Sequence, residues 1–269
     1  MIPLRTGPTP GSRTFELTPG LARFDGILYG GTGAAASVLA MEAATQRDAL
    51  WVVTQFVAPA HVGETIDVGV DELALGGRIA QLQVRAHVGD RMVFTALGAT
   101  ARPRPEGLTG QYLPMPAVSP PDDCGPVPFG PSSMRDAEMG SSRRLEYRAA
   151  RFVGEAPPGA LALWARVRGI DELTRAGVAY LADMVPPAVA RAAGRVGGGF
   201  SLDNALRFAD VPPAEWVLLD LRGELATNGY GHGRLTAWTP DGILVATGSQ
   251  TASMVHLFAP DDPLWRQEI

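Results

Sequence analysis

The stretch RAGVAYLADMVPPAV, residues 175–189, holds one acid in an apolar run: after Arg175, its only charged residue is Asp183. An ionised carboxylate is costly to bury unless hydrogen bonds or an opposite charge compensate it. Two interpretations fit these residues. Asp183 is a functional carboxylate in a pocket, or it caps a helix break, since Pro186 and Pro187 remove backbone donors just after it. The stretch alone leaves both interpretations open.

Other familiar catalytic and cofactor motifs are missing or incomplete. Gly31–Ala36 fits the GxGxxA dinucleotide-binding fingerprint, but that assignment needs an acid about 20 residues on, where the chain has WVVTQF. No GxSxG nucleophile elbow occurs, and Cys124 is the only cysteine, which excludes a multi-cysteine metal site. The histidines have no close pair at ligand spacing, so we interpret each as a surface or strand residue: His61, His87, His232 and His256. We expect no metal and no cofactor.

Composition narrows the class of protein. The chain has 269 residues, 46% of them hydrophobic and 19% charged, as expected for a globular protein with a large core. It has no lysine, and its net charge of −5 argues against a nucleic-acid partner. The N-terminus lacks the apolar core of a secretory signal, and no apolar run reaches the roughly 18 residues that span a bilayer. A cytoplasmic protein without a membrane partner is the expectation.

A proline-rich segment, residues 103–135, divides the chain. Such a composition suits an extended connector, because proline interrupts both helices and central strands. We predict three parts: an N-terminal repeat at 1–102, a connector at 103–142 and a C-terminal repeat at 143–269.

The two halves share one predicted order of elements, a helix followed by long antiparallel strands. The first helix is expected at 30–46 and the second at 170–185, with Asp171 as its N-cap. HVGDRM and TPDG are predicted hairpin turns. Gly248 lies 150 residues after Gly98 in a similar strand, and this shift overlays the halves as an internal duplication. The predicted strands are 50–59, 64–74, 78–102, 198–208, 215–226 and 233–255.

A long helix rich in Ala and Gly needs close cover on most sides, and a curved antiparallel sheet wrapped around it supplies that cover. Five further motifs follow one another along the chain: LYGGTGAAASVLA, LWARVRG, AYLADM, FSLDNALRF and DGILVATGSQ. With these motifs in this order, the chain resembles the type II acyl-CoA thioesterases of the double hotdog class. The resemblance covers most of the chain outside the connector. It implies an α+β fold of two tandem repeats, each with a long helix wrapped by a curved antiparallel sheet.

The resemblance also implies a site and a reaction. In that family an aspartate, a Thr or Ser and a Gln hold and activate the water that attacks a thioester; the matching positions are Asp183, Ser201 and Gln250. A carboxylate accepts the proton of the water, and a hydroxyl and an amide fix its position. Asp203 also matches the pattern; strand alternation places it on the face of Ser201, so we expect a supporting role.

Backbone N–H groups at the start of the first helix are expected to polarise the thioester carbonyl in this family. The matching positions are Gly30, Gly31 and Thr32, although the family pattern favours Gln at the last of these. The implied substrate is a fatty acyl-CoA, cleaved to free acid and CoA. A homo-oligomer, dimeric or larger, is the implied assembly.

Three alternatives stay open on the sequence. One is a non-catalytic acyl-CoA-binding hotdog protein. A second is a hotdog hydratase or dehydratase, which normally needs an Asp–His pair. A third is another kind of hotdog thioesterase that uses a helix Glu. The candidate is Glu42, which we interpret as an ordinary residue on a solvated face of the helix.

The duplication predicts that only the second repeat is catalytic. The shift of 150 residues maps Asp183, Ser201 and Gln250 onto Gly33, Trp51 and Thr100, so the first repeat lacks the acid and the amide. We expect the first repeat to supply a wall of the acyl pocket instead.

Overall fold

The computed structural model of the protein describes residues 2–8, 11–127 and 140–260. Its first half contains one long helix and six strands. These elements are β1 (Arg5–Thr6), β2 (Arg13–Glu16), α1 (Gly30–Thr45), β3 (Asp48–Phe56), β4 (Thr65–Leu75), β5 (Ile79–Val88) and β6 (Arg91–Ala101).

The second half contains two short helices and seven strands. These elements are β7 (Leu145–Ala150), β8 (Ala160–Val167), α2 (Arg175–Leu181), α3 (Val185–Ala192), β9 (Val196–Ser201), β10 (Asp203–Phe208), β11 (Val217–Thr227), β12 (Tyr230–Trp238) and β13 (Leu244–Phe258).

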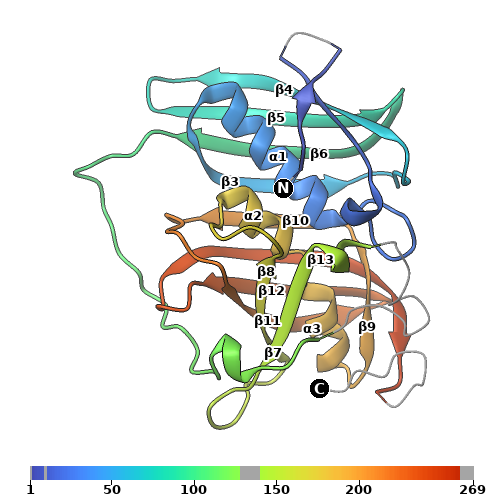
Figure 1. Cartoon of the computed structure of the whole chain (residues 1–269), viewed down its shortest axis with the longest axis vertical. Helices are drawn as coiled ribbons and strands as arrows, with labels where there is room; N and C mark the ends of the chain where they lie inside the picture. Colours follow the sequence, from blue (N-terminus) through green and yellow to red (C-terminus); the bar gives the residue numbers. More distant parts are fainter. Residues whose placement is uncertain (1, 9–10, 128–139, 261–269) are drawn as a thin grey trace.

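In the described part of the chain, all strands belong to one antiparallel sheet of 13 strands, in which β3 pairs with β10 and so joins the two halves. Figure 1 shows the halves stacked, each with its helices in front of its own strands, while the connector runs along one side. Both predicted hairpin turns occur, between β5 and β6 and between β12 and β13. The predicted α+β architecture of two tandem repeats is confirmed.

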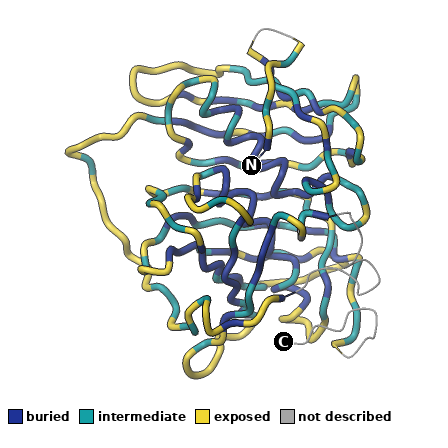
Figure 2. Tube along the Cα trace, in the orientation of Figure 1, coloured by how far each residue is buried: buried dark blue, intermediate teal, exposed yellow. Residues whose placement is uncertain are grey.

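The core lies between the helices and the concave side of the sheet. Helix α1 consists mostly of small or apolar residues. From Gly30 to Met41 every residue except Leu39 is buried. Figure 2 shows buried residues along the helices and strand centres, and exposed ones along loops and the connector. Close packing of α3 on β12 requires glycine, since a Cβ on Gly233 would lie 2.8 Å from Val185 Cγ1.

The second helix differs from the prediction. Instead of one helix at 170–185, the chain forms α2 and α3 with a break at residues 182–184. Thr174, not Asp171, is the N-cap of α2, and its side chain accepts a hydrogen bond from Gly177 N. The break follows from Pro186 and Pro187, which cannot donate to a preceding turn and therefore occupy the first turn of a new helix.

A single shift of 150 residues does not relate the two repeats throughout. Gly98 on β6 pairs with Val52 on β3, whereas Gly248 on β13 pairs with Leu206 on β10, which lies 154 residues after Val52. The counterpart of Trp51 is therefore Ala205, and the predicted correspondence of Trp51 with Ser201 is wrong. The helix break and β9 add residues that the first repeat does not have.

Candidate active site

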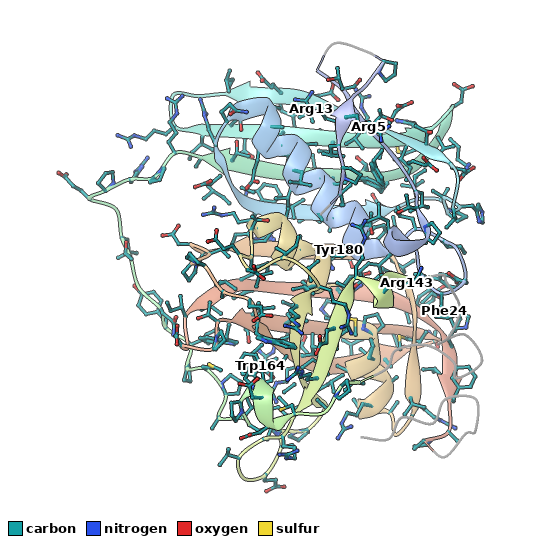
Figure 3. The ribbon with its side chains drawn as sticks, in the orientation of Figure 1. Arg5, Arg13, Phe24, Arg143, Trp164 and Tyr180 are labelled. Carbon is teal, nitrogen blue, oxygen red and sulfur yellow. The ribbon has the colours of Figure 1, made fainter. Side chains whose placement is uncertain are left out.

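A cavity of about 1250 Å³ opens where the two repeats meet. Both repeats line it, together with the segment that leads into α1 and the start of β7. Most of the lining is apolar, including Phe24, Leu28, Phe56, Val93, Met184 and Leu202. Figure 3 places Phe24 and Arg143 on the same side of the molecule, near the junction of the repeats. An apolar hollow of this size suits a largely apolar small-molecule ligand.

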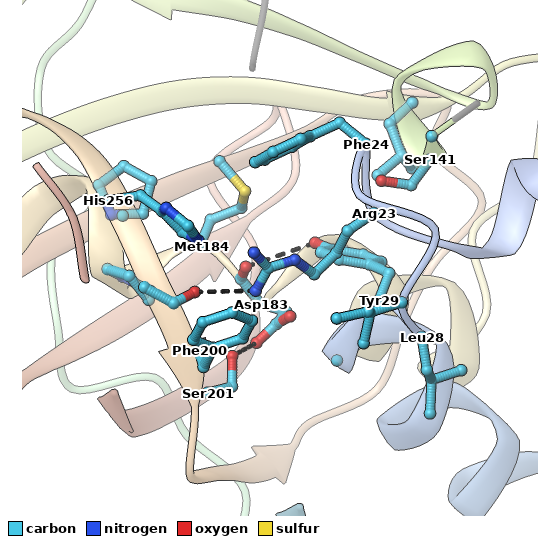
Figure 4. Close-up of a pocket in the computed structure, with 18 of the residues that line it drawn as sticks. Arg23, Phe24, Leu28, Tyr29, Ser141, Asp183, Met184, Phe200, Ser201 and His256 are labelled. Carbon is cyan, nitrogen blue, oxygen red and sulfur yellow. Dashed lines mark hydrogen bonds between the residues drawn. The ribbon is translucent and has the colours of Figure 1, made fainter. Parts of the chain in front are cut away.

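Asp183 lies in the break between α2 and α3, at the wall of this cavity, and is only 7% exposed. Its Oδ1 accepts a hydrogen bond from Ser201 Oγ at 2.9 Å and another from Gln250 Nε2. Its Oδ2 accepts from the backbone N–H of Gly31 at 3.0 Å. The three predicted side chains therefore meet, and Figure 4 shows Asp183 and Ser201 joined at the cavity.

The interpretation of Asp183 as a cap of the break does not hold for α3. The N-cap of α3 is Met184, which makes no capping bond with its side chain, and Gln250 Oε1 accepts the Val185 N–H at 3.2 Å instead. Asp183 instead accepts a hydrogen bond from the backbone N–H of Gly31, at the start of α1 in the other repeat. The positive end of that helix favours a negative charge there.

Gln250 fixes the positions of Asp183 and Ser201 through hydrogen bonds from outside the cavity. It is 1% exposed and does not line the cavity, and its Nε2 also donates to Ser201 Oγ at 2.7 Å. One amide group thus fixes Ser201, Asp183 and the first turn of α3 at once. Gln250 is placed to position the other two side chains rather than to touch a substrate.

Burial raises the pKa of Asp183 from its ordinary value of 3.8 to about 6. The side chains of Ser201, Asn204 and Gln250 and the Gly31 amide act in the opposite direction, because they favour the charged form. A carboxylate with this pKa is ionised at neutral pH and is a stronger base than an exposed aspartate.

The start of α1 must be glycine for this contact to form. A Cβ on Gly30 would lie 2.5 Å from Asp183 Oδ2, and one on Gly31 would lie 2.2 Å from Tyr180 O. The three predicted carbonyl-binding amides are not equally available, however. The Gly31 N–H is bonded to Asp183, and the Thr32 N–H to Tyr29 O at 2.9 Å. The Thr32 hydroxyl donates to Leu21 O. Of the three residues, only Gly30 lines the cavity.

Asp203 does not share the face of Ser201, although alternation predicts that it does. Its Oδ1 accepts the backbone N–H of Thr251 at 2.6 Å, next to Gln250 on β13. The reason is a one-residue irregularity at Leu202: Ser201 pairs with Ala252, but Ala205 pairs with Ser249, so one extra residue stands on this strand. Such a bulge exchanges the faces beyond it.

Sequence reasoning missed several residues of the cavity. Arg23 enters it from the segment before α1, donates to Gly199 O at 3.1 Å and lies 4.3 Å from the Phe200 ring centroid. Tyr29 OH contacts Asp183 O at 3.4 Å. His256, predicted to be an ordinary strand residue, packs its ring against Phe200 at the cavity wall. No motif marks these residues, since each reaches the cavity through tertiary packing.

Glu42 has a structural contact and does not line the cavity. Its Oε1 accepts the Ala49 N–H at 3.0 Å and so fixes the turn between α1 and β3. It is half-buried, and burial raises its pKa, so the predicted solvated face is only partly correct.

Among the described residues, no group of three or more acids, histidines or cysteines is placed to hold a metal ion. The described helices also include none that is both long and apolar enough to cross a membrane.

Comparison with known proteins places the chain in a class. Two family models match it: the acyl-CoA thioesterase N-terminal domain at residues 18–101 and the C-terminal domain at residues 121–254. Solved structures of two candidate thioesterases and of a hot dog fold protein of unknown function share its architecture. The double hotdog fold is therefore confirmed. The chain belongs to the acyl-CoA thioesterase family and is a thioester hydrolase.

Individual structures agree over nearly the whole chain. A candidate thioesterase from Novosphingobium aromaticivorans is 28% identical, with a TM-score of 0.85, over 95% of this chain and 100% of that one. The TesB2 acyl-CoA thioesterase II of Mycobacterium marinum is 19% identical, with a TM-score of 0.72, over 96% of both chains. A TesB protein of Mycobacterium avium subspecies paratuberculosis is 21% identical, with a TM-score of 0.74, over 93% of this chain and 94% of that one. No curated protein matches the sequence.

Proposed function

We propose that the protein hydrolyses a fatty acyl-CoA to free acid and CoA with a water molecule activated at Asp183. The observation that carries this proposal is the buried carboxylate at the wall of a large apolar cavity, bonded to Ser201 and Gln250. Asp183 Oδ1 already accepts two side-chain donors, whereas Oδ2 accepts only the Gly31 N–H. A carboxylate oxygen accepts about two hydrogen bonds, so the water belongs at Oδ2.

The reaction then follows from this placement. The water oxygen attacks the thioester carbonyl carbon while Asp183 takes one of its protons. The resulting tetrahedral oxyanion collapses, the carbon–sulfur bond breaks, and the CoA thiolate takes up the proton from Asp183. Ser201, which lines the cavity, holds the water on one side, and Gln250 acts through Ser201 and Asp183.

The Gly30 N–H is the proposed donor to the carbonyl oxygen. It lies in the first turn of α1, it lines the cavity, and no described residue accepts its hydrogen bond. A helix start favours the negative charge that develops on that oxygen. Asp203 supports the site by fixing the backbone of β13 beside Gln250.

The two ends of the substrate meet different surfaces. The apolar wall formed by Phe56, Val57 and Val93 of the first repeat is the proposed acyl side. Arg143 and Arg168 line another part of the cavity and are the proposed contacts for the CoA phosphates. Among the described residues that line the cavity, the first repeat contributes this wall and the Gly30 N–H but no carboxylate.

The test is release of CoA thiol from a panel of saturated acyl-CoAs by wild-type protein and by Asp183→Asn. Hydrolysis that depends on Asp183 supports the proposal. Tight acyl-CoA binding without thiol release would favour the non-catalytic alternative. Conversion of an enoyl-CoA to its hydroxyacyl form, without thiol release, would favour the hydratase. The division at residues 102 and 142, the homo-oligomer and the cytoplasmic location stay predictions.

A further inference from the structure

Two buried polar side chains lie behind the proposed site without hydrogen-bond partners. Asn204 on β10 and Thr54 on β3 are both 0% exposed. Among the described residues, Asn204 Nδ2, Asn204 Oδ1 and Thr54 Oγ1 make no hydrogen bond of acceptable distance and angle. Such groups are rare because each costs about 1–3 kcal/mol, so a native protein that keeps them needs a reason.

The sheet register brings the two side chains together. Asn204 and Thr54 are directly opposite each other where β10 pairs with β3, the seam between the repeats. Directly opposite residues of an antiparallel pair point to the same face, with Cβ atoms about 4.5–5.5 Å apart. Both side chains are buried, so this is the inner face of the sheet, toward the helices.

The irregularity at Leu202 is what aims Asn204 at the site. Ser201 and Asn204 are three residues apart, so a regular strand would place them on opposite faces. The extra residue on this strand returns Asn204 to the inner face, three positions after the side chain that bonds Asp183. Asn204 does not line the cavity, so it is out of reach of the substrate.

We infer that Asn204, backed by Thr54 of the first repeat, is a positioning residue for Asp183 that serves as its reserve hydrogen-bond donor. This inference rests on the proposed role of Asp183. Ser201 Oγ–H is bonded to Asp183 Oδ1 in the free protein, and when it donates to the water instead, that carboxylate oxygen loses a donor. The Asn204 amide then takes its place. Hydrogen bonds at catalytic sites are often long in the free enzyme and shorten only when substrate is bound.

The electrostatics agree with this placement. The Asn204 side chain lowers the pKa of Asp183, against the larger opposing effect of burial. A neutral amide has this effect only if it favours the charged carboxylate, as a donor beside it does. Removal of the amide therefore raises the pKa of Asp183.

The experiment is a titration of Asp183 by NMR, with ¹³Cγ-labelled aspartate, in wild-type protein and in Asn204→Leu, a substitution that keeps the branched shape of the side chain. The Asp183 resonance is the one that Asp183→Asn lacks. We expect its midpoint to rise by about half a pH unit or more in Asn204→Leu, because the Asn204 amide favours the charged carboxylate already in the free protein. The matched control is Thr100→Val, which removes another fully buried hydroxyl, one bonded to Thr45 in the first repeat, and should leave the midpoint unchanged.

An unchanged midpoint in folded Asn204→Leu would overturn the inference. If that variant does not fold, Thr54→Val decides instead: a rise supports the inference, and no change overturns it. The titration needs no turnover, so it also separates this inference from the proposed function. Wild-type protein that releases no thiol refutes the function only, whatever the midpoint does. Where the enzyme is active, the acid limb of its pH–rate profile should move by the same amount in Asn204→Leu.

Discussion

Asp183 and Glu146 are both acids on the cavity wall, and each is only 7% exposed, yet their surroundings differ. Glu146 is paired with three arginines: Arg148 at 2.9 Å, Arg166 at 2.7 Å and Arg168 at 3.2 Å. Asp183 is bonded only to neutral groups, the hydroxyl of Ser201, the amide of Gln250 and a backbone N–H.

This difference reverses the direction in which the pKa shifts from its ordinary value. Burial raises the pKa of both groups. At Glu146 the hydrogen bonds from Arg166 and Arg148 outweigh burial and lower the pKa, whereas at Asp183 burial dominates and the pKa rises to about 6. A neighbouring cation lowers the pKa of a buried acid and so keeps it charged, whereas neutral donors leave the pKa high enough for the acid to take a proton. Burial alone therefore does not identify the base.

The largest expected effect separates the two acids by rate. Asp183→Asn keeps the size and shape of the side chain but removes the proton acceptor, so turnover of an acyl-CoA should fall by about 10²- to 10⁴-fold. The matched control, Glu146→Gln, should keep turnover within about three-fold, because an acid already bound to arginines contributes no base. The measurement is initial-rate thiol release at saturating substrate. Equal losses in both variants would mean that the comparison of the two acids does not identify the base.

The second prediction concerns stability as a function of pH. The folded pKa of Asp183 lies above its unfolded value, so its contribution to stability is fully present below about pH 4 and is lost as the pH rises through about 6. Two pKa units correspond to about 3 kcal/mol. Asp183→Asn should therefore match the wild type near pH 4 and be more stable at pH 7, by thermal unfolding at both values. A variant less stable at pH 7 would show that the charge is stabilising there.

The third prediction tests the neutral donors. Ser201→Ala and Gln250→Ala each remove a hydrogen bond to the reacting groups, which costs about 1–3 kcal/mol, or about 5- to 150-fold in turnover. Gln250→Ala should also lower the thermal midpoint more than Ser201→Ala, because it leaves the Val185 N–H at the start of α3 without its acceptor. Wild-type rates in both variants would remove these side chains from the mechanism.

The sequence could predict what depends on local pattern. The small residues of α1, the two hairpin turns and the repeat order follow from periodicity and turn chemistry, and the resemblance correctly brought Asp183, Ser201 and Gln250 together. The sequence pattern could not predict the bulge at Leu202, because one extra residue moves the following side chains to the opposite face of the strand without changing the composition of the strand. Asp203 was therefore placed wrongly, and Asn204 was passed over.

The long-range contacts of the cavity also left no local signal. Arg23 reaches Gly199 across 176 residues, and the acceptor for the Gly31 N–H lies 152 residues away. The helix break was visible only as two prolines, and the same prolines fitted a cap just as well. Only the tertiary structure shows that Gln250 caps α3, which leaves Asp183 available to the other repeat.

The smallest expected effect belongs to Glu146 and completes the comparison. Its folded pKa lies below its unfolded value, so it stabilises the protein above the unfolded pKa of about 4, and this stabilisation is lost as the pH falls through the folded pKa. Glu146→Gln should cost about 1–2 kcal/mol at pH 7, less than a fully buried pair, because Arg168 is half exposed to solvent. The cost should shrink as the pH falls, opposite to Asp183→Asn, whose gain grows as the pH rises. Thermal unfolding of both variants between about pH 3 and pH 8 measures the two signs in one series. If both variants drift in the same direction with pH, then the arginines do not distinguish these acids, and a cation beside a cavity carboxylate is no reason to exclude it as the base.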